Sequence, residues 1–209
     1  VSTSNQNRVV SNNGFWSEGS RQDNTSRIVT NGNLNLLANR DLTLQGASIN
    51  NTQGDLLLTA GRQLQLDVAE NSRQYSQSQS GNGISVSSQV DAVKHLSTQL
   101  NSAGNISLHS GDNLNLISAQ LHAGQDLTMI AANNLNVSAA KDSQDYASIS
   151  RIKPRTDILQ SQDQQVISNN LNANGNLSII AQGGDLSLKT VNATAVQGAL
   201  TLAAQNNLE

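Results

Sequence analysis

The chain has 209 residues and a formal net charge of −3 at pH 7, with only 13% charged and 2% aromatic residues. The small negative charge gives no indication of nucleic-acid binding, which a basic net charge would suggest, and no run approaches the roughly 18 apolar residues of a membrane span. The sequence has no cysteine, hence no disulfide framework. It also has no initiator Met, signal peptide or sorting tail, so we interpret it as an excised segment.

Residues 1–31 hold the only Phe and the only Trp, side by side at Phe15 and Trp16. We interpret 1–31 as the end of an insert and the lead into the first coil of a repeat structure. The reason is that Ile28 stands four residues before a Gly-Asn pair, as leucines do in the later repeats. Two interpretations of Phe15-Trp16 stay open: a cap on the first coil or a frayed end, and an apolar partner site.

The rest of the chain repeats. "GNLNLLANRDLTLQGASI" begins at Gly32, "GNISLHSGDNLNLISAQL" at Gly104 and "GNLSIIAQGGDLSLKTV" at Gly175, so the offsets are 104 − 32 = 72 and 175 − 104 = 71. Each unit nearly repeats again within itself, because Leu34 recurs as Leu56 at an offset of 56 − 34 = 22. The shorter period is typical of one coil of a parallel β-solenoid, with three short strands and three corners.

Aliphatic residues two apart, separated by Gly, Asn and Asp, predict short strands with one buried side. The first face is expected to carry Leu34/Leu36, Leu56/Leu58, Ile106/Leu108, Leu127/Met129, Leu177/Ile179 and Leu200/Leu202. The second is expected to carry Leu42/Leu44, Leu64/Leu66, Leu114/Leu116, Leu135/Val137, Leu186/Leu188 and Leu208. A thinner third face is expected in the odd coils, from Ala47/Ile49, Ala119/Leu121 and Val191/Ala193.

These faces predict an all-β protein over residues 32–209: a right-handed parallel β-helix of about six coils with projecting β-hairpin inserts. The corner before the first face alternates amides and carboxylates, in the order Asn33, Asp55, Asn105, Asp126, Asn176 and Ala199. Stacked like charges would repel, whereas alternating amides and carboxylates can form a hydrogen-bonded ladder. We therefore expect such a ladder along this corner.

The first predicted insert covers about 67–103. It alternates small and polar residues around Asn82-Gly83, the strongest short-range signal for a hairpin with a two-residue type I′ turn. With that turn, Gly81 opposes Ile84 and Tyr75 opposes Val90. We expect a hairpin that projects from the solenoid.

The second predicted insert covers about 138–174 and carries the basic stretch "ISRIKPRTD". Pro154 argues against a tight two-residue turn with a paired amide at that tip. The two inserts are two coils apart, about 9.6 Å, which is close to the roughly 10 Å spacing of packed sheets. We therefore predict that successive hairpins stack face to face, a small polar face against an apolar one. The competing interpretation is that Tyr75 and Tyr146 each pack at the base of their own hairpin.

Little in the sequence indicates catalysis. The corner before the second face reads Asp41, Gln63, Asn113, Asn134, Asp185 and Asn207, so no two carboxylates are stacked neighbours there, and paired acid–base chemistry needs carboxyl groups about 5–10 Å apart. The three histidines, His95, His109 and His122, are expected on a hairpin, a strand end and a corner, which does not suit a metal site. We expect no catalytic residue, no metal and no cofactor.

The stretch "AGNISLHSGDNLNLISAQLHAGQDLTMIAANNLNVSAAKDS" resembles the haemagglutinin repeats of large two-partner-secreted exoproteins, the filamentous haemagglutinins and the CdiA proteins of contact-dependent growth inhibition. The resemblance extends from about residue 27 through all three units. It implies a right-handed parallel β-helix in the stalk of a secreted, surface-held bacterial fibre. The long inserts at a fixed phase are more similar to the later, toxin-proximal repeats of CdiA than to a plain shaft.

The resemblance implies a non-catalytic stalk or delivery segment whose partners are neighbouring repeats of the same exoprotein and the target-cell envelope or a host-cell surface. Nucleic-acid partners and a transmembrane segment are not expected. The alternative is an adhesin module that binds a carbohydrate or a receptor through its hairpins. The expected contact surface on the hairpins comprises Tyr75, Tyr146, Arg151, Lys153 and Arg155.

Overall fold

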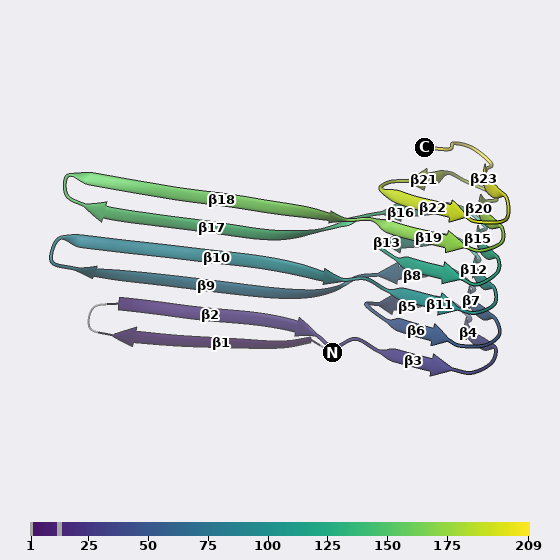
Figure 1. The fold of residues 1–209 in the computed structure, drawn as a ribbon, viewed down its shortest axis with the longest axis horizontal. Coiled ribbons are helices and arrows are strands. Elements are labelled where there is room, and N and C mark those ends of the chain that lie inside the picture. Colours follow the sequence, from purple (N-terminus) through teal and green to yellow (C-terminus); the bar gives the residue numbers. More distant parts are fainter. Residues whose placement is uncertain (1, 12–13) are drawn as a thin grey trace. The chain divides into compact units, whose positions relative to one another are not determined.

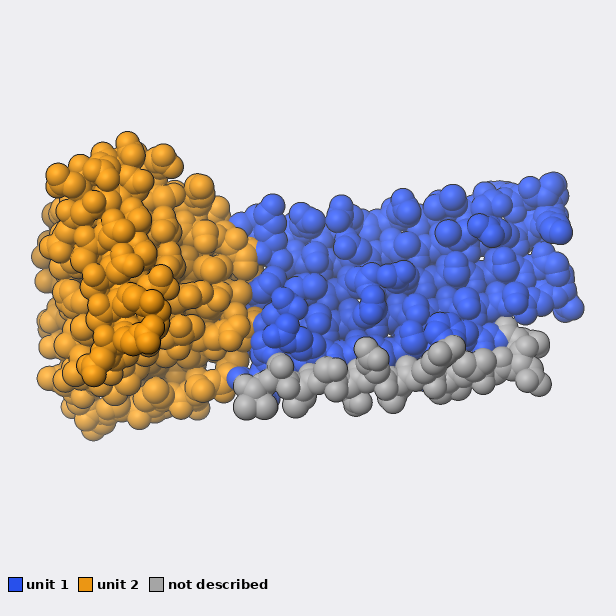
Figure 2. Space-filling view, turned by 180° about the vertical axis from the view of Figure 1, so that it is seen from behind, with its two compact units in different colours: residues 1–24, 70–96, 141–166 blue, residues 25–69, 97–140, 167–209 orange. Residues whose placement is uncertain are grey.

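The computed structural model describes the backbone of residues 2–11 and the backbone and side chains of residues 14–209. The chain forms two compact units (Figure 2). We call residues 25–69, 97–140 and 167–209 the coil unit, and residues 1–24, 70–96 and 141–166 the hairpin unit. Strands make up both units, and the prediction of an all-β parallel β-helix with hairpins is confirmed.

The coil unit contains three parallel sheets, one for each predicted face (Figure 1). The sheet of the first face has six strands: β4 (Leu34–Ala38), β7 (Leu56–Ala60), β12 (Ile106–Ser110), β15 (Leu127–Ala131), β20 (Leu177–Ala181) and β23 (Leu200–Ala204). The sheet of the second face has five: β5 (Leu42–Gln45), β8 (Leu64–Asp67), β13 (Leu114–Ile117), β16 (Leu135–Ser138) and β21 (Leu186–Leu188). Leu208 extends it by a single bridge to Leu186.

The third sheet differs from its prediction. Its six strands are β3 (Arg27–Thr30), β6 (Ser48–Asn51), β11 (Gln99–Ser102), β14 (Gln120–Ala123), β19 (Asn169–Ala173) and β22 (Val191–Ala195). The even coils therefore also contribute strands, because the chain rejoins this sheet at Leu100 and Leu171, which are fully buried. Each hairpin is inserted between the second and third strands of a coil and does not replace the third strand.

Every sheet is in the register that the leucine pairs predict. Leu34 pairs with Leu56, and Leu114 pairs with Leu64 on one side and Leu135 on the other. Because alternate residues point inward, the leucines stack into one continuous core. Leu114 and Leu186 are both fully buried in the sheet of the second face, as predicted. The right-handed sense and the number of coils stay predictions.

The predicted ladder along the first corner is confirmed. In each step the Oδ1 atom of one residue accepts a hydrogen bond from the backbone N–H of the residue one coil later. The steps join Asn33 to Asp55 at 2.9 Å, Asp55 to Asn105 at 2.8 Å, Asn105 to Asp126 at 3.0 Å, Asp126 to Asn176 at 2.6 Å and Asn176 to Ala199 at 2.9 Å. The carboxylates serve as acceptors here, and the intervening amides keep them apart.

A buried polar side chain marks the places where the chain returns from the two predicted inserts, 67–103 and 138–174. Thr98 and Asn169 are fully buried and hold equivalent places in successive repeats. Asn169 donates to the Ser138 carbonyl at 2.6 Å and accepts from the Ala119 N–H at 2.8 Å. Thr98 donates to the carbonyl of Asp67 at 2.6 Å and accepts from the N–H of Ala47 at 3.3 Å. Each side chain thus replaces backbone partners that the coil loses where it is interrupted.

The hairpin unit is one six-stranded antiparallel sheet in the order β1-β2-β9-β10-β17-β18 (Figure 1). Its strands are β1 (Ser2–Ser11), β2 (Gly14–Asp23), β9 (Ala69–Gly81), β10 (Ile84–Leu96), β17 (Ala140–Ile152) and β18 (Arg155–Ile167). Phe15 and Trp16 lie in β2, paired with Ser78 and Gln77 of β9. They are therefore part of this sheet, and the interpretation as a cap or a frayed end is wrong.

We number the hairpins in chain order: β1–β2 is the first, β9–β10 the second and β17–β18 the third. The tip of the second hairpin, which forms the first predicted insert, is the two-residue turn predicted from Asn82-Gly83. Asn82 has a φ of 51° and Gly83 a φ of 80°, the two positive values that a type I′ turn requires. β9 ends at Gly81 and β10 begins at Ile84, so these residues oppose each other and the alignment continues to Tyr75 opposite Val90.

The tip of the third hairpin is also a two-residue turn, at Lys153-Pro154, with a cis peptide between them. The expectation that Pro154 argues against such a turn is wrong. In a two-residue hairpin the flanking residues, here Ile152 and Arg155, carry the ladder hydrogen bonds. The proline amide at the tip is therefore not needed as a donor.

Successive hairpins join edge to edge, and the prediction that they stack face to face is wrong. β2 pairs with β9, Glu18 opposite Tyr75, and β10 pairs with β17, Val90 opposite Tyr146. The coil sheets and the hairpin sheet grow by the same distance in each repeat. Two coils advance by two strand spacings of about 4.8 Å, and one hairpin adds two strands at the same spacing. Each hairpin thus reaches the edge of the next, and backbone groups that would face solvent are paired instead.

Candidate functional site: the hairpin sheet

One face of the hairpin sheet carries three aromatic residues, while Phe15, next to Trp16 in β2, lies on the other face. Trp16, Tyr75, Val90 and Tyr146, which we call the aromatic face, are on the same side, because residues opposite each other across antiparallel strands share a face. Tyr75 and Tyr146 flank Val90 in one row across three strands. The hydroxyl of Tyr75 donates to Gln77 Oε1 at 2.8 Å, which fixes that ring along its own strand. All four aromatic-face residues are partly exposed.

The opposite face is polar and lined by small side chains, so it forms shallow grooves. One groove of about 250 Å³ is lined by residues of four strands: Phe15, Ser76, Gln77, Ser78, Ser87, Ser88, Gln89, Ala147 and Ile149. The hydroxyl oxygens of Ser17 and Ser76 lie 2.7 Å apart across β2 and β9. Serine and alanine leave room above the sheet, and this accounts for the hollow.

A second groove on the polar face, of about 410 Å³, contains a pair of carboxylates. Asp91 and Asp145 are directly opposite each other on β10 and β17 and both line this groove. Gln89 Nε2 donates to Asp91 Oδ2 at 2.6 Å, whereas Asp145 Oδ1 is buried without a hydrogen-bond partner. Like charges at directly opposed positions destabilise a sheet. The sequence contains no signal for this pair, because it depends on pairing between two hairpins.

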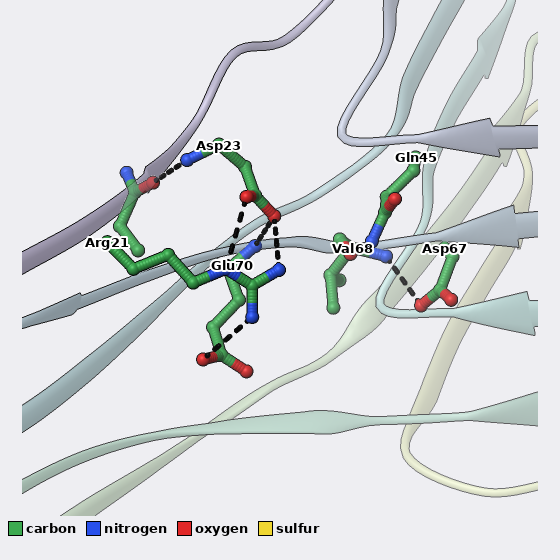
Figure 3. A network of polar contacts seen from close by, with 7 residues as sticks. Arg21, Asp23, Gln45, Asp67, Val68 and Glu70 are labelled. Carbon is green, nitrogen blue, oxygen red and sulfur yellow. Dashed lines mark hydrogen bonds and ion pairs between the residues drawn. The ribbon is translucent and has the colours of Figure 1, made fainter. Parts of the chain in front are cut away.

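The base of the first hairpin is fixed by ionic and backbone contacts (Figure 3). Arg21 Nη2 lies 3.2 Å from Asp23 Oδ2, and Arg21 Nη1 lies 3.7 Å from Glu70 Oε1. The Glu70 N–H donates to Asp23 Oδ2 at 3.2 Å, and the Asp23 N–H donates to Asn71 Oδ1 at 3.0 Å. The Asp23 side chain, only 10% exposed, therefore ties β2 to the start of β9.

The residues predicted as a contact surface fall into two groups. Arg151, Lys153 and Arg155 are exposed at the tip of the third hairpin, and Arg155 Nε is 2.7 Å from Asp157 Oδ1. Tyr146 lies five residues from Arg151 along β17, about 17 Å at 3.4 Å per residue. The structure therefore places a basic tip and an aromatic face apart on one sheet.

The three histidines lie on different strands. His95 is in β10 and its Nδ1 is 3.2 Å from Asp142 Oδ1. His109 lies in β12, and His122 lies inside strand β14, so its expected place at a corner is wrong. Among the residues that the structure describes, no three His, Asp or Glu side chains form a group that could hold a metal ion.

The model of the hemagglutinin repeat matches residues 9–96 and 87–151, more than half of the chain. The chain belongs to the hemagglutinin repeat family. Hemagglutinin-repeat proteins are secreted or surface exoproteins whose repeats are typically structural or adhesive. The match is consistent with a repeat segment of a two-partner-secreted exoprotein.

Neither the curated proteins nor the solved structures include a match to this hemagglutinin-repeat chain. The described part of the chain contains no helix long and apolar enough to cross a membrane.

Proposed function

We propose that the chain is a non-catalytic stalk and delivery segment of a large, secreted bacterial surface exoprotein of the CdiA type, from the repeat region next to the toxin. The observation that carries the proposal is the hairpin inserted at the same point of every second coil, with successive hairpins paired into one sheet. A plain shaft needs only the coils. The regular second sheet indicates a task beyond spacing.

The composition of the coil unit supports a mechanical role for that unit. Its buried leucines stack through every strand, and its corner carboxylates are engaged as hydrogen-bond acceptors. On this proposal residues 1–31 are the end of a preceding insert and the lead into the first coil. Residues 32–209 form the β-helix with inserts at about 67–103 and 138–174, and the partners are neighbouring repeats and the target-cell envelope.

The test removes residues 69–96 and 140–167 separately from the exoprotein that carries them, joining the coil ends through a short Gly-Ser linker. We expect surface display and attachment to target cells to persist while inhibition of target-cell growth is lost. Attachment and inhibition both surviving would contradict a delivery role. An exoprotein whose downstream sequence encodes no toxin-like domain would contradict the CdiA assignment.

A second candidate function is adhesion, and the aromatic face favours it. Tyr and Trp present flat, partly exposed rings with polar edges, the chemistry that stacks on sugar rings and anchors protein interfaces. The basic tip formed by Arg151, Lys153 and Arg155 adds an anion-attracting group. On this proposal the chain binds a carbohydrate or a receptor through its hairpins.

Glycan arrays and pull-downs from cell envelopes with the isolated chain distinguish the two functions. Saturable binding that is lost in the double variant Tyr75→Ala/Tyr146→Ala, and kept in Ser76→Ala/Ala147→Ser on the other face, favours adhesion. Circular dichroism of both variants checks that the sheet is retained. Absence of saturable binding by the parent chain contradicts adhesion and leaves the delivery role standing.

A further inference from the structure

The two grooves on the polar face of the hairpin sheet meet at Gln89 and Ala147, which line both of them. Phe15 on β2 lies at one end of the combined trough, and Asp145 on β17 lies at the other. Strand pairing places Phe15 in one row with Ile149, so the two ends are three strand spacings and four residues apart, about 20 Å along the diagonal. The trough crosses β9 and β10 (Figure 1), which are paired on both sides, and does not depend on an edge of the sheet.

Between its ends the trough is lined by hydroxyl and amide groups, from Ser76, Ser78, Ser87, Gln89 and Gln160. The backbone groups of the inner strands are occupied by the neighbouring strands, so side chains must recognise a ligand that lies across this face. Hydroxyls and amides both donate and accept hydrogen bonds, as the hydroxyl groups of sugars do. An extended peptide binds a sheet mainly through a strand edge, where backbone groups are free. A glycan therefore fits the trough better than a peptide.

The carboxylates at one end of the trough lack a positively charged partner. Asp91 and Asp145 are directly opposite each other, and within the described residues neither forms an ion pair. Gln89 donates to Asp91, but Asp145 Oδ1 is buried without a hydrogen-bond partner. A buried polar atom without a partner is costly, and the repulsion between the two carboxylates adds to the cost. A cationic group of a ligand would offset both costs.

An ammonium group suits this end of the trough better than a metal ion does. An ammonium donates up to three hydrogen bonds. The groove offers acceptors on Asp91, on Asp145 and on the side-chain carbonyl of Gln162. Calcium, in contrast, takes about six to eight oxygen ligands, and the described side chains include no group of three or more His, Asp or Glu that could hold a metal ion.

We propose that the trough binds a short glycan that carries free amino groups, with one ammonium between Asp91 and Asp145 and the sugar units extending past Gln89 toward Phe15. Phe15 offers an apolar ring against which the apolar face of a sugar packs. The inference rests on the adhesive function proposed above and assigns a class of glycan to it. The site, however, is on the face opposite to Tyr75 and Tyr146, so the two faces can be tested separately.

The first test titrates the whole chain with a β-linked glucosamine tetramer by isothermal titration calorimetry at about pH 6, where amines are positively charged. The N-acetylated tetramer is the matched ligand, because it has the same rings without the charges. We expect saturable binding of the glucosamine tetramer and binding of the N-acetylated tetramer that is weaker by about tenfold or more, since ammonium–carboxylate contacts are charge-assisted hydrogen bonds. Equal affinities, or no saturable binding of the glucosamine tetramer at millimolar concentration, overturn the proposal.

The second test changes the carboxylate pair. Asp145→Asn should weaken binding of the glucosamine tetramer by about tenfold or more, even though the same substitution removes a like-charge contact from the sheet. Asp163→Asn is the matched control, because it removes one charge from β18 next to Gln162 but on the other face. An equal loss in both variants indicates unspecific attraction to negative charge and overturns the site.

The double variant Tyr75→Ala/Tyr146→Ala separates this site from the aromatic face and should keep the binding of the glucosamine tetramer. If that variant loses the binding while Asp145→Asn keeps it, the glycan binds to the aromatic face. That result supports adhesion and overturns the trough.

The third test uses the length of the ligand. Affinity should rise from the glucosamine monomer to the tetramer, because the trough is longer than one sugar. Ala147→Leu puts a larger side chain where the two grooves meet, so it should remove this gain and leave monomer binding unchanged. Ala92→Leu adds the same volume on the other face, opposite Gln144, and should keep the gain. An affinity that does not depend on length, or an equal effect of the two leucine variants, overturns the trough.

Discussion

Asp55 Oδ1 accepts two hydrogen bonds from Asn105, one from its backbone N–H at 2.8 Å and one from its side-chain Nδ2 at 3.0 Å. Asn105 Oδ1 in turn accepts from the Asp126 N–H at 3.0 Å. The side chain of an asparagine is both donor and acceptor, whereas an ionised aspartate only accepts. Asn105 is therefore the residue that separates two carboxylates while joining them in one ladder.

Replacing this asparagine by aspartate tests the ladder. Asn105→Asp removes the Nδ2 donor and places three carboxylates in successive coils, so we expect a loss of about 1–2 kcal/mol at neutral pH. The control Asp55→Asn keeps the acceptor and should change the unfolding free energy little. Equal urea stability of Asn105→Asp and the parent would contradict the charge argument.

The buried leucine stack predicts a strong and position-specific response to charge. Leu114 is fully buried between Leu64 and Leu135, so Leu114→Asp buries a carboxylate without a partner and should cost several kcal/mol. Asn115→Asp adds the same charge one residue along, on the outer side of the strand, and is expected to keep the parent's melting temperature within a few degrees. Thermal unfolding followed by circular dichroism measures both. A Leu114→Asp variant with the melting temperature of the parent would contradict the placement of Leu114 in the buried core.

The buried side chain of Asn169, where the chain returns from the third hairpin, predicts that threonine but not leucine can replace it. Asn169→Leu leaves the Ala119 N–H and the Ser138 carbonyl without their partner, which should lower the unfolding free energy by roughly 2–4 kcal/mol. Asn169→Thr should recover a large part of this, because Thr98 makes the equivalent two hydrogen bonds one repeat earlier. Chemical denaturation measures the series. If Asn169→Thr is no more stable than Asn169→Leu, side-chain volume and not hydrogen bonding determines the stability at this site.

The opposed carboxylates of the polar face predict a stabilising substitution. Asp145→Asn removes the like-charge contact with Asp91 and gives the buried position a neutral side chain, so we expect a gain of about 0.5–1 kcal/mol. Asp142→Asn is the contrasting variant, because Asp142 Oδ1 accepts the His95 N–H at 2.7 Å and faces the His95 ring; it should not stabilise. Differential scanning calorimetry at pH 7 compares them. A destabilised Asp145→Asn would indicate that the carboxylate has an attractive partner in solution.

The ion pair between Asp41 and Arg62 at a corner of the coil predicts how the Asp41 carboxyl titrates. The hydrogen bond from Arg62 holds the pKa of the Asp41 carboxyl below its ordinary value of 3.8, with smaller contributions from the backbone N–H of Gln63 and the charge of Arg40. A lowered carboxyl pKa stabilises the fold above the unfolded pKa, and this is lost as the pH falls through the folded value. In Arg62→Gln the Asp41 pKa should rise. Carbon-detected NMR of the carboxyl measures the titration, and an unchanged pKa would contradict the pairing.

The sequence predicts features that depend on neighbours in the same coil or one coil away. Leucine pairs such as Leu34/Leu36 indicate strands and their buried face, and the Asn-Asp alternation indicates the corner ladder. Asn82-Gly83 predicts its turn because few residue pairs adopt positive φ at both positions. All of these signals are local or recur at the repeat period.

The pairing between hairpins could not be predicted in the same way. Antiparallel edges join through backbone groups that every residue carries, so the pairing of Val90 with Tyr146 leaves no pattern in the sequence. The Asp91–Asp145 contact follows from that pairing and was missed with it. Thr98 and Asn169 were missed because a single buried polar residue among many Ser, Thr and Asn has no distinguishing composition.

The alternation of one hairpin with two coils restricts how such a chain can lengthen. A hairpin contributes two strands, so duplication of one whole repeat, for example the segment from Gly104 to Asn174, extends the leucine stacks and the hairpin sheet by equal amounts. Duplication of a single coil would instead separate two hairpins by one extra spacing and leave a gap one strand wide between, for example, β10 and β17. Natural length variants of this protein should therefore gain or lose coils in pairs, and an odd count should coincide with a lost, added or three-stranded insert.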